Sequence, residues 1–234
     1  MLISGRNLEQ VVRPGEEPPR SVTSAVFVHL RSEVLTGDLK AGQPLRAAAI
    51  AERLRVSLTA VREALVRLLS DNFVTSVDQK GFRVSPVSLE DLLDVTQTRI
   101  QIEGEALRQS MARGGAEWRE RIVASHQRLS RIPQRLPEAP HQTNEAWAEE
   151  HERFHLSLVD ACGSPWLLRF RSTLYAHSER YRRLSVRGSG ASVREVAAEH
   201  DDIVRSVLNG DADAAVEALS QHYRRTMDIA RSVL

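Results

Sequence analysis

Four of the eight histidines in this 234-residue chain stand on apolar helix faces, where a buried metal ligand would be placed. His151 and His155 are four residues apart and share one helix face, and His200 and His222 lie on two further helical segments. One inward histidine is ordinarily a core residue with a hydrogen-bond partner. Four on three helices indicate more, because a shared cation satisfies every buried imidazole at once. The spacing therefore predicts a metal site between helices.

The segment from His151 to His155 also reads His-Glu-x-x-His, the zinc motif of metallopeptidases. In that chemistry the two histidines hold zinc and the glutamate, here Glu152, activates a water molecule. The pattern is short and arises by chance, and charged neighbours such as Glu150 are typical of an exposed face. A peptidase would also leave the two later histidines without a role. We therefore expect no enzyme, with a zinc metallopeptidase as the alternative hypothesis.

Arg99 and Glu103 interrupt the buried stripe of another predicted helix. An internal ion pair between residues four apart would explain both. Alternatively, Arg99 clamps the carboxylate of an effector, because a guanidinium offers a two-pronged donor. Tyr175, Arg180 and Tyr181 are further residues that could line the pocket. The predicted effector site is Arg99, Glu103 and Tyr181.

The elements that position these residues follow from periodicity and from helix breakers. We expect no strand after residue 88, and Ser88 with Asp91 resembles a helix start. Residues 88–234 should form an antiparallel all-α bundle that binds the metal and the effector. The expected helices cover residues 89–112, 116–131, 143–162, 165–186, 192–209 and 212–232.

The first part of the chain has a different pattern. Residues 1–20 contain three prolines among charged residues and are predicted to be a flexible arm. Residues 21–87 are predicted to form a winged helix-turn-helix, with Gly81 at positive φ in the hairpin. Its expected helices cover 22–35, 47–54 and 58–70, and its expected strands cover 73–76 and 82–85. The fold class is therefore mainly α.

In a helix-turn-helix the second helix enters the major groove, and its first residues meet the base edges. Ser57 can cap that helix, and Thr59 and Arg62 share a face that can reach bases or phosphates. The wing tip, at Lys80 and Gly81, is placed to meet the flanking backbone or minor groove. The predicted DNA-contacting residues are Arg46, Ser57, Thr59, Arg62, Lys80 and Gly81.

Composition sets the remaining limits. The formal net charge is +1, so the chain as a whole is no polyelectrolyte, and the single cysteine, Cys162, suits a reducing cytosol. We see no secretory leader and no apolar stretch near the roughly 18 residues that cross a bilayer. We expect a cytoplasmic protein without a membrane partner.

Residues 24–88 resemble the N-terminal domain of GntR-family regulators, which implies operator DNA as a partner. Three positions depart from that family's pattern. Leu58 and Ala60 stand where arginine and proline are usual, and Arg55 stands at a turn position that usually holds glycine. The missing arginine removes an expected operator contact, and Arg55 would be strained if φ is positive there. The matching segments are Leu30–Gly37, Ala51–Leu54, Val61–Leu65 and Gly81–Val84.

Residues 88–232 resemble the FCD ligand-binding domain of the FadR subfamily, many members of which bind a divalent metal through one aspartate and three histidines. Carried over by position, the histidines are His155, His200 and His222, and the aspartate position holds His151. Four neutral ligands leave the 2+ charge uncompensated, which favours Zn²⁺ or Ni²⁺ and attracts an anion. The matching segments are Phe154–Leu158, Ala161–Ser164, Glu199–Ile203 and Gly210–Ala214, with His222.

Together these observations predict a homodimeric repressor that reads a palindromic site. A small carboxylate bound at the metal and Arg99 would weaken its affinity for the operator. Residues 162–185 resemble regulators of the carbon-starvation and glutarate type, which implies a dicarboxylate such as glutarate. A regulator that senses the metal itself is the alternative within this class.

Overall fold

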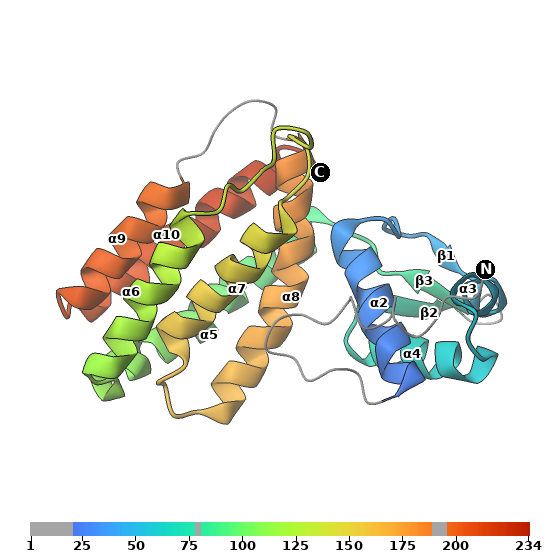
Figure 1. Cartoon of the computed structure of the whole chain (residues 1–234), viewed down its shortest axis with the longest axis horizontal. Helices are drawn as coiled ribbons and strands as arrows, with labels where there is room; N and C mark the ends of the chain where they lie inside the picture. Colours follow the sequence, from blue (N-terminus) through green and yellow to red (C-terminus); the bar gives the residue numbers. More distant parts are fainter. Residues whose placement is uncertain (1–20, 78–80, 189–195) are drawn as a thin grey trace. The chain divides into compact units, whose positions relative to one another are not determined.

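The computed structural model describes residues 21–77, 81–188 and 196–234, and it divides into two compact units, Met1–Val87 and Ser88–Leu234 (Figure 1). The predicted arm at 1–20, the wing residue Lys80 and the expected helix start at 192 lie outside these described residues. The two units are described separately below.

The first unit holds three helices and a small sheet. The expected helices are confirmed, and those at 47–54 and 58–70 match to the residue. A side-chain cap explains the sharp start of the helix at 58–70, because the Ser57 hydroxyl accepts the Ala60 backbone N–H at 3.1 Å. The elements are α2 (Val22–Thr36), β1 (Pro44–Leu45), α3 (Ala47–Leu54), α4 (Leu58–Ser70), β2 (Val74–Val77) and β3 (Gly81–Val84).

The hairpin strands β2 and β3 pair antiparallel, each within one residue of its predicted bounds, and Gly81 has the expected positive φ, at 80°. A third strand, β1, pairs with β3 and was not predicted, because it has only two residues and the first of them, Pro44, is typical of a turn. Arg83 supports this pairing by donating from Nη1 to the Gly42 carbonyl at 2.7 Å. Helix α4 packs its apolar side against α2, so the opposite side of α4 is exposed.

Arg55 does adopt the left-handed conformation that its place in the turn implies. Its φ and ψ are 55° and 45°, and its backbone N–H closes the end of α3. A residue with a Cβ is strained there, because the Cβ approaches the neighbouring carbonyl oxygen. Helix α3 therefore ends on a residue that lowers the stability of the turn.

We expect Arg55→Gly to raise the free energy of unfolding by about 1 kcal/mol, since glycine adopts this conformation without that strain. Thermal unfolding of the full chain, with hydrogen exchange in α3 and α4, measures the effect. Ala48→Gly, at an exposed helical position of α3, should lower stability by a similar amount. Equal destabilisation by both variants would contradict a strained turn.

The second unit is a bundle of helices, as expected. They are α5 (Leu89–Arg113), α6 (Ala116–Ser130), α7 (Glu145–Val159), α8 (Pro165–Gly188), α9 (Val196–Leu208) and α10 (Ala212–Arg231). Helices α5 and α10 start at the predicted residues, and each start has a side-chain cap. The Ser88 hydroxyl accepts the Asp91 N–H, and the Asp211 carboxylate accepts the Ala214 N–H. In the described part of this unit the sole β pairing is an isolated bridge, Leu136–Ala139.

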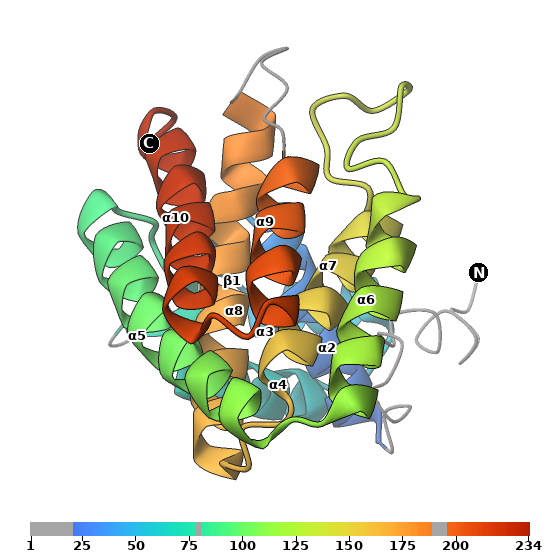
Figure 2. The same ribbon diagram turned by 90° about the vertical axis from the view of Figure 1, so that its left-hand side faces the viewer.

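Helix α10 lies between α5 and α9, and α8 packs against both α5 and α10 (Figure 2). Helix α7 packs on α6 and also reaches α5. Helices α7, α9 and α10 thus bring side chains far apart in the sequence to one interior region. That region is closed by fully buried residues such as Phe154, Leu158 and Ile203.

Candidate metal centre, effector cavity and DNA face

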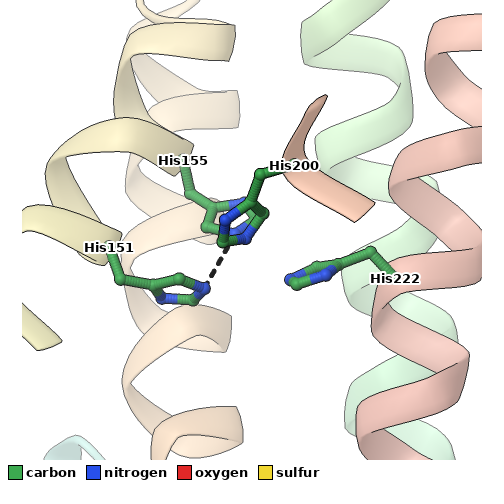
Figure 3. Close-up of side chains that lie close together, drawn as sticks. All are labelled: His151, His155, His200 and His222. Atoms are coloured by element: carbon green, nitrogen blue, oxygen red, sulfur yellow. Dashed lines mark hydrogen bonds between the residues drawn. The ribbon is translucent and has the colours of Figure 1, made fainter. Parts of the chain in front are cut away.

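The structure brings the four predicted histidines together (Figure 3). Helix α7 supplies His151 and His155, α9 supplies His200 and α10 supplies His222, and each of these residues is at most 3% exposed. One ring nitrogen of each lies within 4.8 Å of the corresponding nitrogens of the others. Four tetrahedral ligands at a Zn–N distance of about 2.1 Å stand about 3.4 Å apart, so the longest of these separations would have to close by somewhat more than an ångström.

Hydrogen bonds on the outer side of two rings fix which nitrogen faces inward. The Tyr223 hydroxyl donates to Glu103 at 2.8 Å and therefore accepts from His155 Nδ1, 3.1 Å away. His222 Nδ1 lies 2.8 Å from a carboxylate oxygen of Glu199 and so carries the proton. Both rings are left with an Nε2 lone pair for the interior. Such carboxylate-supported imidazoles are the usual surroundings of metal-binding histidines.

His151 completes the group from the side of α7. Its Nε2 lies 3.1 Å from Nε2 of His155, and its ring stacks on Trp147 with centroids 4.4 Å apart. Burial lowers the pKa of His151 and His155 well below the usual range, and the neighbouring imidazoles add to this. The rings are therefore neutral, which is the form that binds metal.

A cavity of about 410 Å³ opens beside the histidines. His151 and His222 line it, together with two of the predicted effector residues, Arg99 and Tyr181. The Tyr181 hydroxyl is already engaged, because it donates to Asp91 at 2.5 Å. Of the five residues considered for this pocket, Tyr175 also lines it, but Arg180 and Glu103 are not among its lining residues.

Glu103 lies behind the cavity instead of in it, so the structure gives no support to its predicted contact with an effector. It is fully buried, accepts from Arg99 Nε at 2.5 Å, and stands 3.7 Å from Arg171 Nε. Through Tyr223 it also supports the His155 ring. Glu103 therefore joins the arginine at the cavity to the imidazole cluster.

Arg99 forms the internal ion pair that was one of its two interpretations, and it also lines the cavity. It forms the internal ion pair with Glu103, and its Nη1 donates to the Ser178 hydroxyl at 2.8 Å. Its Nη2 is buried and has no hydrogen-bond partner among the residues that the structure describes. An unpaired buried donor costs free energy unless a ligand accepts from it. Arg99 thus lines the cavity and keeps one buried N–H group unsatisfied within the described part of the chain.

Arg182 has the same property and was missed by sequence reasoning. Its Nε and Nη2 donate to Glu179 at 2.7 and 2.5 Å, and its Nη1 is buried without a partner. Burial by itself would raise the pKa of Glu179, but Arg182 and Arg183 lower it to about 2, so the carboxylate stays charged. The signal for Arg182 was its spacing on α8, where Tyr175, Ser178 and Arg182 follow each other at intervals of three and four residues.

The charged neighbours of the His-Glu-x-x-His segment are not all exposed, contrary to expectation. Glu150 is 8% exposed and pairs with Arg128, at 3.2 Å, and with Arg153. The histidines of the segment converge with two further histidines. The second unit therefore uses the segment as one side of a four-imidazole cluster.

In the first unit, the predicted DNA-contacting residues that are described all lie at the surface. Ser57 caps α4, and Thr59 and Arg62 are exposed on the same helix. Arg46, just before α3, and Gly81, the first residue of β3, are exposed as well. Arg62 is thus available for a base or phosphate contact.

We expect Arg62→Ala to weaken operator binding tenfold to a hundredfold, because a two-pronged arginine contact to a base contributes about 1–3 kcal/mol. Fluorescence anisotropy with duplex DNA measures this change, and circular dichroism verifies the fold. Arg119→Ala, an exposed arginine on α6, serves as the control and should bind like the unmodified chain. Unchanged affinity of Arg62→Ala would remove that residue from the DNA contacts.

A winged helix-turn-helix followed by an all-helical unit is the architecture of a class of transcription regulators. Residues 22–84 match the profile of the bacterial regulatory proteins of the gntR family, and residues 94–225 match the FCD domain. The chain therefore belongs to the GntR family of transcription regulators and carries an FCD domain.

Individual relatives agree. The chain is 40% identical over 212 residues to BphR, an HTH-type transcriptional regulator of Paraburkholderia xenovorans, covering 91% of this chain and 86% of that one. It is 30% identical over 208 residues to the transcriptional repressor GlaR of Escherichia coli, covering 88% and 94%. Escherichia coli McbR shares the fold, with a TM-score of 0.73, 20% identity and coverage of 91% and 98%.

These relatives and the two family matches are regulators and not enzymes, so the metallopeptidase hypothesis is not supported. Among the described residues, no helix combines the length and the apolar character that crossing a membrane requires.

Proposed function

We propose that the chain is a repressor whose affinity for operator DNA is set by a small carboxylate bound beside a divalent metal. The observation that carries this proposal is the placement of four buried imidazoles next to a cavity whose wall holds Arg99 with an unpartnered N–H. As a regulator of bacterial genes it would act in the cytoplasm.

His151, His155, His200 and His222 would hold the metal, with Zn²⁺ preferred and Ni²⁺ as the second choice. The bound ion would supply positive charge and a coordination position for a carboxylate oxygen. Since all four ligands are neutral, they leave that charge uncompensated. The burial of the cluster, at 0–3% exposure, favours a resident metal over one that exchanges as the signal.

The charges around the cavity favour a dicarboxylate. Arg99 and Arg171 share Glu103, and Arg182 shares Glu179 with Arg183, which also pairs with Glu145. The group thus has four guanidinium groups and three carboxylates. Arg99 contacts Ser178, one helical turn before Arg182. Arg99 and Arg182 both line the cavity, and a short dicarboxylate such as glutarate would place one carboxylate at each guanidinium group.

Control of transcription would follow from differential binding. A carboxylate changes DNA affinity only if it binds one arrangement of the two units better than another. We further propose a homodimer, since two copies related by two-fold symmetry present two recognition helices to a palindromic site. The repressor names of GlaR and of the D-xylose operon regulator of Paenarthrobacter nicotinovorans support repression as the mode of action.

A thermal-shift screen of the metal-loaded chain tests this proposal. Dicarboxylates of three to six carbons are compared with the monocarboxylate of equal length, with and without a chelator. A ligand at 100 times its dissociation constant stabilises by about 2.7 kcal/mol, which shifts Tm by several degrees. We expect a dicarboxylate to give this shift only with metal present. A shift by metal and by no carboxylate would support the metal-sensing alternative and contradict the proposal.

A further inference from the structure

The exposed side of the recognition helix α4 has two parts, and the residues of one part contact side chains of α2. The Thr23 hydroxyl donates to Glu63 at 2.9 Å. Arg67 donates to the Ser24 hydroxyl at 3.2 Å, and its guanidinium lies 4.1 Å from the ring centroid of Phe27. Glu63 and Arg67 thus already have partners within the unit, so they are poorly placed to read base edges.

The other part carries Leu58, Thr59, Arg62 and Val66, which are all exposed. At 100° per residue these four side chains fall within an arc of roughly 100°. Leu58 is the first residue of α4 and is 38% exposed, and Arg62 follows it one turn later. The first turn is the part of a recognition helix that meets the bases. Leucine therefore occupies a position from which base edges are read.

Leucine has no hydrogen-bond donor or acceptor, so it can recognise only an apolar feature of a base. In the major groove that feature is the C5 methyl group of thymine. We propose that Leu58 selects thymine in each operator half-site by packing on this methyl group, beside the base or phosphate that Arg62 contacts. This inference rests on operator binding by α4, and it explains what the chain reads at a position where its family usually has arginine.

The test begins with the full chain and a random duplex library, from which the preferred operator is selected. Each thymine of the half-site is then replaced by deoxyuridine, which removes one methyl group and leaves every hydrogen-bonding atom in place. Binding of each duplex is measured for the unmodified chain, for Leu58→Ala and for Val66→Ala. Val66, 52% exposed on the same face but two turns further along, is the matched control.

We expect deoxyuridine at one thymine of a single half-site to weaken binding of the unmodified chain about fourfold, the equivalent of one methyl group removed from an apolar contact. The same replacement should have no effect on Leu58→Ala and should keep its effect on Val66→Ala. Selection with Leu58→Arg should replace that thymine by guanine, because arginine pairs with the O6 and N7 atoms of guanine.

Three results would overturn the proposal: no thymine sensitive to methyl removal, a deoxyuridine effect that persists in Leu58→Ala, or an effect that disappears in Val66→Ala instead. Failure to select any sequence would contradict operator recognition itself, and it is distinguishable from these three because no duplex would then bind. Circular dichroism shows that each variant keeps its helices before binding is measured.

Discussion

Alanine in place of His155 or His200 is expected to abolish bound metal and to lower the melting temperature of the metal-loaded chain by several degrees. Each substitution removes one of four converging imidazoles and leaves an apolar gap beside buried nitrogen atoms. A metal present at 1,000 times its dissociation constant stabilises the folded state by about 4 kcal/mol, and this contribution disappears with binding.

Metal content per chain is measured by elemental analysis after loading with Zn²⁺ and gel filtration, and Tm is measured with and without chelator. His126→Ala is the control, because His126 pairs with Asp201 at 3.2 Å and stands outside the cluster. The control should keep one metal per chain and the chelator-sensitive Tm. One metal per chain in His155→Ala or in His200→Ala would refute the proposed ligand set.

Arg99→Gln is expected to weaken carboxylate binding tenfold to a hundredfold while leaving metal content unchanged. A hydrogen bond between two charged groups contributes about 1.5–3 kcal/mol, and the shorter amide cannot replace it. The Glu103 carboxylate still has partners after this change, because it keeps the hydrogen bond from the Tyr223 hydroxyl at 2.8 Å and the ion pair with Arg171 at 3.7 Å. The variant should therefore fold.

Isothermal titration of the metal-loaded chain with the effector from the thermal-shift screen measures this affinity. Arg108→Gln is the matched control, because Arg108 lies on the same helix but is exposed and pairs with Asp213. It should bind like the unmodified chain. Unaltered affinity in Arg99→Gln would show that the arginine serves only its ion pair with Glu103.

Most helix bounds could be predicted because they depend on local chemistry. The Ser57, Ser88 and Asp211 caps are sequence signals, and the structure shows each of them. Strand β1 could not be predicted in this way, since Pro44 and Leu45 become a strand only through pairing with β3. The helix predicted over 143–162 is shorter at both ends, because Asn144 caps it with its side chain and the chain turns after Val159.

The histidine cluster could be inferred because helical periodicity places all four side chains inward. The supporting residues could not, because Tyr223, Glu199 and Arg182 acquire their roles from contacts between helices. The same limit applies to Glu103. Its position on the helix predicted that the side chain points inward, but not whether that side chain would reach the cavity or the core behind it. Arg55 is a local case: its turn position predicted a left-handed backbone, and φ is 55°.

The central claim is that a metal-bound carboxylate controls DNA affinity, and operator binding as a function of effector tests it most directly. Anisotropy titrations would use the selected operator and the full chain with metal, without metal, and with His155→Ala. We expect the dicarboxylate to weaken operator binding of the metal-loaded chain at least fivefold, within the usual range of coupling between two sites. The metal-free chain and His155→Ala should not respond. An equal response in all three samples, or none from any carboxylate that binds, would contradict the claim.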